Sequence, residues 1–490
     1  MRTAGYFLAK SRLNRMLAWM ISVWIKKGSV FAVLIIFIGL LHEVWAPYVW
    51  PVHIVEAGYD GWRITQHANN HEVEGYASQT SVTAGQSIDL HISSKTEHNS
   101  AIIFRLGWYD GVGGKKMATI SSIRASMRQI PSANPDTGLV QPNWPIAATV
   151  QIPSDWQSGV YVVKLINAEN FQSYIPFVVK DISVKNSLAL VHTDITDQAY
   201  NAWGGNSLYR GFTEKLGISR GVQISLQRPL LQNDGAGYIF EWEYPMIRFL
   251  EKNEYSVSYI SSSDIVANPN ILKQFKTILI VGHDEYWTKI QFDAYQAAVK
   301  SGVNLGIFAA NTDYRQIRIE NNVLIGYKDS YRLDPEFDED ESAATTEWRS
   351  SIVHRPESTL IGAMFATQVP KAFPLVITNP SHWIFSGTNV QKNQAIPGMV
   401  GYECDKVFSE FPKPNNLEIL TTSPVLTMKK VPEVCNATIY QAPSGAYVFN
   451  AGTIQWSSAL DKYHSRFGEN AIIQRATKNI LNTFSGLPNK

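Results

Sequence analysis

Cysteine is scarce in this chain: only two of the 490 residues are cysteine, Cys404 and Cys435. Two cysteines cannot build the framework of a small disulfide-stabilised domain, so the stability of the fold has to come from buried apolar side chains. In an exported chain the pair can form one disulfide, and two free buried thiols are the alternative. Neither cysteine lies in a Gly-x-Cys-x-Gly turn, so neither has the context of a nucleophile elbow.

The chain also lacks an excess of either charge. Its 43 basic and 42 acidic residues leave a net charge of +1, which gives no reason to expect nucleic acid as a partner. The length suggests two to four domains, and 45% hydrophobic residues are ordinary for globular proteins. Aromatic residues are abundant at 12%, which suits β-rich modules and ring-lined clefts as well as plain cores.

Long apolar runs are missing except near the N-terminus. Residues 1–28 contain several Lys and Arg and no acid, and the uncharged run 28–41 follows them. This run is short for a membrane span, which takes roughly 17–25 residues, but 44–52 is again apolar and aromatic. The basic flank predicts an uncleaved signal anchor over 29–52, with the N-terminus inside and the bulk of the chain outside the cytoplasm. A cleaved signal peptide and a buried core helix are the alternatives.

Two regions with different periodicities follow the apolar segment. Residues 55–182 contain short alternating segments such as SIDLHIS between Gly- and Asp-rich turns, which predicts a β-sandwich. From about 186 to 488, strand-like runs alternate with helix-like runs such as EWEYPMIRFLEKN. This alternation predicts a mostly parallel, doubly wound sheet. The predicted fold class is therefore α/β plus all-β, with a membrane-anchor helix in front.

Polar and aromatic residues follow the strand-like run KTILIVG in the stretch VGHDEYW. A helix is expected from about Thr288, so residues 283–287 should form a loop at the carboxyl edge of the sheet. The same reasoning places 192–205 and 311–318 at this edge, where α/β proteins bind their ligands. The alternative is that Tyr286 and Trp287 form an aromatic lip over the core.

The motifs of several enzyme classes are absent from this edge. The sequence contains no serine nucleophile elbow and no His-Glu-x-x-His zinc signature. It offers Tyr, Glu, Asp and a few His instead, and carboxylate and phenolate oxygens suit hard cations such as Fe³⁺. A bound cation could acidify a water for attack on a carbonyl group.

Several segments carry a family resemblance. The stretches RLGWYDGVGG, AYNAWGGNSLY, EWEYPMIRFLEKN, GHDEYW, GIFAANTDYRQIR and GYECD occur in an order that resembles the family of the N,N-dimethylformamidase large (beta) subunit, C-terminal region. The resemblance implies an immunoglobulin-like β-sandwich fused to a flavodoxin- or glutamine-amidotransferase-like domain. It also implies hydrolysis of a small amide at a mononuclear non-haem iron held by two tyrosines and one glutamate.

Carried over to this chain, the resemblance implies Tyr244 and Tyr286 as metal ligands, with either Glu347 or Glu403 as the third. His283, Asp284 and Glu285 are then the candidates for acid–base catalysis. The expected partners are a small-molecule substrate, the membrane through the anchor and, as a possibility, further copies of the chain. The alternative function is a non-catalytic envelope protein that binds a glycan or another ligand, with an exposed row formed by Trp108, Trp144 or Trp203.

Overall fold

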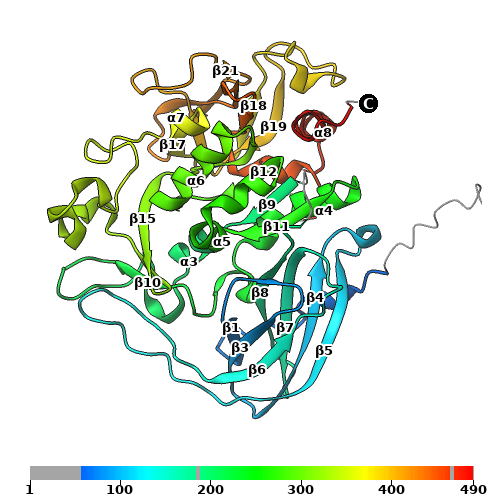
Figure 1. Ribbon diagram of the computed structural model, residues 1–490, viewed down its shortest axis with the longest axis vertical. Helices are drawn as coiled ribbons and strands as arrows, with labels where there is room; N and C mark the ends of the chain where they lie inside the picture. The colour runs from blue at the N-terminus through cyan, green and yellow to red at the C-terminus, as the bar shows by residue number, and fades with distance from the viewer. Residues whose placement is uncertain (1–56, 184–187, 464–467, 489–490) are drawn as a thin grey trace, which may run out of the picture. The chain divides into compact units, whose positions relative to one another are not determined.

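A computed structural model describes residues 57–183, 188–463 and 468–488. The first strands form a five-stranded sheet, β2-β8-β7-β4-β5, and a three-stranded sheet, β1-β3-β6 (Figure 1). The strand bounds are β1 Val73–Ala77, β2 Ser81–Thr83, β3 Ser87–Ser94, β4 His98–Leu106, β5 Gly114–Arg124, β6 Ile146–Gln151, β7 Gly159–Asn167 and β8 Gln172–Lys180.

These two sheets share one apolar core. The alternation predicted for SIDLHIS is confirmed, because Ile88, Leu90 and Ile92 of β3 are buried in that core. Val163 of β7 and Phe177 of β8 enter it from the larger sheet. Successive side chains of a strand point to opposite faces, so this pattern buries one face of each sheet. The immunoglobulin-like character of the pair of sheets stays a prediction.

A seven-stranded sheet of order β11-β9-β12-β14-β25-β24-β21 follows along the chain. The first five strands of this order are parallel, and β24 and β21 are antiparallel to their neighbours. The bounds are β9 Leu188–His192, β11 Val257–Ser261, β12 Thr277–His283, β14 Asn304–Ala310, β21 Glu418–Ile419, β24 Thr438–Gln441 and β25 Tyr447–Asn450.

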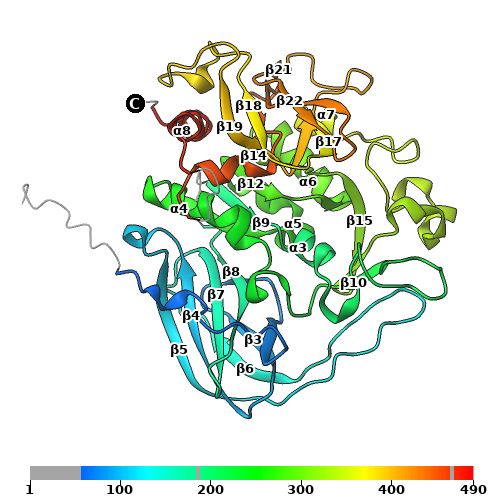
Figure 2. The same ribbon diagram turned by 180° about the vertical axis from the view of Figure 1, so that it is seen from behind.

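Helices cover both faces of this sheet, as comparison of Figures 1 and 2 shows. On one face, α4 and α8 pack against side chains such as Leu279 and Phe308, and on the other α5 and α6 pack against Ile280 and Ile307. The helix expected from about Thr288 is α6, and a capping box formed by Thr288 and Gln291 marks its start. The helix bounds are α3 Asp194–Tyr200, α4 Tyr244–Lys252, α5 Ser262–Ala267, α6 Lys289–Lys300, α7 Ser358–Ile361 and α8 Ala471–Ser485.

Several small sheets surround the large one. One has the order β10-β16-β15-β13, and three two-stranded sheets pair β17 with β20, β18 with β19 and β22 with β23. Their bounds are β10 Gln223–Ser225, β13 Tyr286–Thr288, β15 Arg315–Glu320, β16 Val323–Ile325, β17 Met364–Gln368, β18 Phe373–Val376, β19 Ala395–Val400, β20 Glu403–Lys406, β22 Ser423–Leu426 and β23 Pro432–Cys435.

The predicted fold class therefore needs correction. The described residues form a mixed α/β structure with many sheets and few helices, in place of a regular doubly wound parallel domain. The sequence pattern did not predict this because the strands after residue 310 have only two to six residues each, which is too short to establish a clear alternation of apolar and polar side chains.

The membrane prediction is corrected as well. Within residues 57–183, 188–463 and 468–488, no helix has the length and apolar character that a membrane span requires. The segment 29–52, which was predicted to be the anchor, lies outside the described residues.

The two cysteines form a disulfide between β20 and β23, Cys404–Cys435. The bridge closes a loop with a sequence separation of 31, and such a loop is worth about 3–4 kcal/mol through the entropy of the unfolded chain. We expect the Cys404→Ser/Cys435→Ser variant to lose stability of this size in urea denaturation. Two results together would contradict this expectation: an unfolding midpoint of the variant equal to that of wild type, and a wild-type midpoint that does not change when a thiol reductant is added.

Candidate functional site

The candidate site begins at the carboxyl end of β12. The run Thr277–Val281 is buried because β12 lies between β9 and β14 in the parallel part of the sheet. Gly282 has φ +77°, and a Cβ atom there would lie 2.2 Å from Cβ of Trp242. Only glycine fits this close approach, which brings the chain past Trp242 and leads into His283.

His283 lies between two carboxylates. Its Nε2 is 3.2 Å from Oε2 of Glu403 and 3.5 Å from Oε2 of Glu285. All three residues are at least 96% buried. Asn311, which follows β14, donates through Nδ2 to Glu403 at 3.1 Å and lies 3.2 Å from His283 Nε2. The amide of Gln368 donates to the other oxygen of Glu403 at 2.8 Å.

Phenols gather on the other side of Glu285. The hydroxyl of Tyr209 donates to the carboxylate, with its oxygen 2.8 and 2.9 Å from the two carboxylate oxygens, and Tyr200 donates a hydrogen bond to Oε2. Tyr286 donates to the hydroxyl of Tyr209 at 2.7 Å. The rings of Tyr200 and Tyr209 stack with centroids 4.3 Å apart. Tyr209 is 41% exposed, so its ring extends from the surface to a buried carboxylate.

The fold brings these side chains to one edge of the parallel strands. Tyr200 ends α3, the helix after β9, while His283 ends β12 and Asn311 follows β14. Glu403 begins β20, which pairs with β17. The predicted location at the carboxyl edge of the sheet therefore agrees with where these residues lie.

The environment separates the pKa values of the two glutamates. Burial opposes the charge of Glu285, but the hydrogen bond and charge of His283, with Lys328 and Tyr200, lower its pKa to about 2. Burial raises the pKa of Glu403, and the charge of Glu285 adds to this despite the opposing effect of His283. Burial lowers the pKa of His283, but the charge of Glu403 and contact with Glu285 outweigh it, so the net shift is upward. Glu285 therefore stays an anion, while Glu403 is suited to carry a proton.

Asp284 supports the site and faces away from it. Its carboxylate accepts from Thr196 at 3.2 Å and from Nε1 of Trp287 at 2.8 Å. Burial raises its pKa to about 7. Asp284 thus joins α3 to β13. These contacts favour a structural role for Asp284 over the predicted role in acid–base catalysis.

Tyr244 is not brought together with Tyr286. Its hydroxyl donates to the carbonyl oxygen of Gly113 at 2.6 Å, and its ring packs in an aromatic group with Trp62, Phe240 and Tyr463. Tyr286 belongs to a separate apolar cluster.

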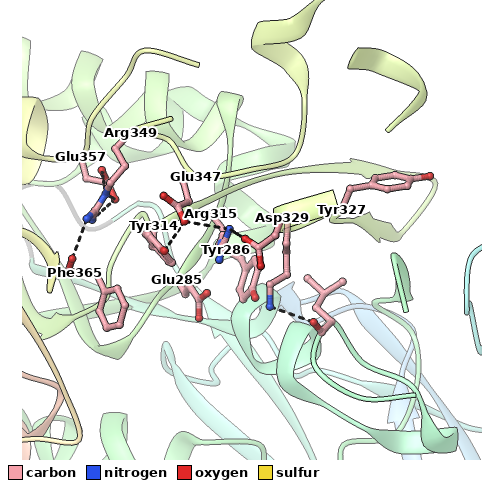
Figure 3. A network of polar contacts seen from close by, with 12 residues as sticks. Glu285, Tyr286, Tyr314, Arg315, Tyr327, Asp329, Glu347, Arg349, Glu357 and Phe365 are labelled. Atoms are coloured by element: carbon pink, nitrogen blue, oxygen red, sulfur yellow. Dashed lines mark hydrogen bonds and ion pairs between the residues drawn. The ribbon is translucent and has the colours of Figure 1, made fainter. Parts of the chain in front are cut away.

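Glu347 belongs to a neighbouring polar network, drawn in Figure 3. It accepts from the hydroxyl of Tyr314 at 2.6 Å and forms an ion pair with Arg315 at 3.6 Å. Arg315 also pairs with Asp329 at 2.9 Å. Of the two glutamates predicted as the third ligand, Glu403 lies beside His283, whereas Glu347 is held by Tyr314 and Arg315.

Sequence reasoning missed three residues of the site: Tyr200, Tyr209 and Asn311. Both tyrosines lie in AYNAWGGNSLY and Asn311 in GIFAANTDYRQIR, which are stretches that carry the family resemblance. The position of these stretches after predicted strands was the available signal. It did not single out any side chain.

Two sizeable cavities lie away from Glu285. One, of about 320 Å³, is lined by residues including His71, Glu74 and Asp234. The other, of about 520 Å³, is lined by residues including Trp383 and Tyr447. The candidate site therefore rests on its convergent polar contacts rather than on the size of a cavity.

Together the fold and the site define a mixed α/β protein with a buried carboxylate, imidazole and phenol cluster at the ends of its parallel strands. Residues 100–469 match the family described as N,N-dimethylformamidase beta subunit-like, C-terminal, and the chain belongs to this family. No curated protein matches the chain. Among solved structures, a cycloisomaltooligosaccharide glucanotransferase of Paenibacillus sp. complexed with cycloisomaltoheptaose is 13% identical and has a TM-score of 0.14. That match covers 26% of this chain and 17% of the other.

Proposed function

We propose that this chain is a hydrolase that cleaves a small amide or another non-peptide C–N bond. One observation carries the proposal: in a member of the dimethylformamidase-like family, the buried carboxylate of Glu285 contacts two phenols on one side and His283 on the other. Hydrolysis of an amide needs a polarised carbonyl, an activated water and a proton for the departing amine. In this proposal, the residues on the His283 side of Glu285 transfer protons, and the phenols on the other side help to polarise the carbonyl.

The residues on the His283 side of Glu285 carry out the proton transfers. Glu403, whose pKa is raised, accepts a proton from the attacking water and returns it to the amine nitrogen. His283 lies between the two glutamates and keeps the transferred proton within hydrogen-bonding reach. Asn311 fixes the orientation of the Glu403 carboxylate through its side-chain amide.

The phenol side offers ligands for a hard cation. Within the described residues, no group of three or more His, Cys, Asp and Glu side chains is arranged to hold a metal ion, so a metal there would need phenol oxygens. Tyr200, Tyr209 and Glu285 supply two phenols and one carboxylate within hydrogen-bonding distance of each other. This set fits Fe³⁺ in number and type, and we propose it in place of Tyr244, Tyr286 and Glu347.

Tyr200, Tyr209 and Glu285 would hold the iron, which would supply Lewis acidity toward the amide carbonyl. Burial and the charge of Glu285 raise the pKa of both phenols above the usual value, so in the absence of a cation they stay protonated and donate to Glu285. A cation has to displace these protons, and its binding should therefore weaken at acidic pH.

The test combines metal analysis, an optical spectrum and a formamide hydrolysis assay on the full chain. Wild type should contain close to one iron per chain with a tyrosinate charge-transfer band and should release formate. Tyr209→Phe should lose most of the iron and the band. Tyr244→Phe, which removes a phenol packed elsewhere, should keep both. A folded wild type that takes up no iron when supplied with it, and that hydrolyses no amide, would refute the proposal.

The alternative of a non-catalytic binding protein loses the feature predicted for it. Trp203 is fully buried and Trp144 is 6% exposed, and their rings pack edge to face at 5.7 Å. With Trp108 only partly exposed, the three do not form an exposed row. Trp144 and Trp203 therefore contribute to the packing of the interior.

A further inference from the structure

The segment Glu403-Cys404-Asp405 in β20 presents three buried side chains in succession. Side chains alternate between the two faces of a strand, so Glu403 and Asp405 share a face and Cys404 takes the opposite one. Glu403 belongs to the candidate site, and Cys404 is bonded to Cys435 of β23. Asp405 has no part in the proposed chemistry, yet its side chain is entirely buried.

The contacts of Asp405 lead back to the site. Its Oδ1 accepts the backbone N–H of Asn311 at 2.8 Å, and its Oδ2 accepts the side-chain amide of Asn450 at 3.2 Å. Its own backbone N–H donates to the carbonyl oxygen of Gly452 at 3.1 Å. These contacts connect β20 to the ends of β14 and β25.

Asn311 needs this support because its backbone has φ +51°. A residue other than glycine occupies the left-handed region at a cost, and surrounding contacts have to hold it there. The conformation matters for the site, since it directs the Asn311 amide to Glu403 at 3.1 Å and to within 3.2 Å of His283. The carboxylate of Asp405 accepts the backbone N–H of Asn311 and so helps to hold Asn311 in this conformation.

We propose that Asp405 is a positioning residue of the hydrolase: by holding the backbone of Asn311 it keeps Glu403 and His283 in contact. The inference rests on the proposed function for its catalytic consequence. Its structural part, the placement of Asn311 and His283, stands independently of turnover.

The test compares Asp405→Ala and Asp405→Asn with wild type in the full chain. Asp405→Ala removes the acceptor for the Asn311 N–H, and kcat for formamide hydrolysis should fall about 10- to 100-fold with little change in KM. Asp405→Asn keeps an oxygen that can accept this N–H, and it should restore most of kcat. If the Asp405→Ala variant does not fold, Asp405→Ser takes its place. The serine side chain is too short for its hydroxyl to reach the backbone N–H of Asn311.

A second readout needs no turnover. Modification by diethyl pyrocarbonate, resolved by peptide mass spectrometry, should be slow at buried His283 in wild type and Asp405→Asn and faster in Asp405→Ala. Exposed His98 serves as the internal reference. The matched control is Asp461→Asn, which alters an equally buried aspartate that pairs with Arg248 at 2.8 Å, and it should change neither kcat nor His283 modification.

The outcomes separate the two proposals. If wild type hydrolyses no amide, the proposed function fails, and the modification rate of His283 alone decides the role of Asp405. A folded Asp405→Ala variant with unchanged His283 modification, or with wild-type kcat in an active enzyme, overturns the positioning role. Equal loss of kcat in the Asp461→Asn control would also overturn it, since the effect would then be general destabilisation.

Discussion

Replacing Glu285 by glutamine should lower kcat/KM for amide hydrolysis by about 10³-fold or more, the upper range for a group that takes part in acid–base or metal chemistry. Glu285 has its pKa lowered to about 2 and is therefore charged throughout the working range. Glutamine keeps the shape and one oxygen for Tyr209, but it removes the charge that faces His283 and offers a neutral oxygen in place of a carboxylate ligand. Steady-state kinetics and iron content measure the two consequences separately.

The control for this variant is Glu251→Gln. Glu251 pairs with Arg105 at 2.8 Å and accepts from the backbone nitrogen of Trp108 at 3.1 Å, and neither of these partners belongs to the candidate site. Its replacement should cost stability and leave kcat/KM near the wild-type value. A Glu285→Gln variant that retains activity within tenfold of wild type, with iron bound, would remove Glu285 from the centre of the site.

Local patterns predicted the elements that carry the site. The strand predicted for KTILIVG, residues 276–282, is confirmed as β12, and the helix expected from about Thr288 is confirmed as α6. Both are encoded by neighbouring residues, the strand by an apolar run and the helix start by a capping box. The stretch between them was predicted to be a loop throughout. In the structure, Tyr286–Thr288 form β13, whose partner β15 lies almost thirty residues away along the chain, and no local pattern specifies such a pairing.

The side chains around Glu285 were only partly predictable. His283 and Glu403 were among the candidates, and they come together in the structure. Tyr200 and Tyr209 reach Glu285 across 85 and 76 positions of sequence, and a single sequence with 22 tyrosines does not show which of them converge. Turns and packing decide which phenol reaches the carboxylate, so Tyr244 could be carried over from a motif and yet donate to the carbonyl oxygen of Gly113 instead.

The second large effect concerns stability at alkaline pH. His192 ends β9, and its Nδ1 lies 3.0 and 3.1 Å from the two carboxylate oxygens of Glu243. Burial lowers the pKa of His192, but the charge and hydrogen bond of Glu243, with the charges of Asp197 and Asp194, outweigh it and raise the pKa to about 10. Burial also raises the pKa of Asp197 to about 8 and that of Asp194 above its usual value.

All three shifts have the same sign. A group whose pKa is higher in the folded than in the unfolded state holds its proton more tightly when folded, so its stabilising contribution is complete below the unfolded pKa. For His192 this contribution is lost as the pH rises from 6.5, the unfolded value, through about 10. The slope for one proton is about 1.4 kcal/mol per pH unit, which makes the loss from His192 alone several kcal/mol.

Urea denaturation at pH 6, 8 and 10 tests this expectation. The unfolding free energy of wild type should fall across the series, and His192→Gln should give a flatter profile because glutamine does not titrate. At pH 6 this variant should also be less stable than wild type, since Glu243 loses its charged partner while it remains 2% exposed. His98→Gln, at an exposed position, should follow the wild-type profile. A wild-type stability that stays level or rises from pH 6.5 to 10 would contradict the raised pKa of His192.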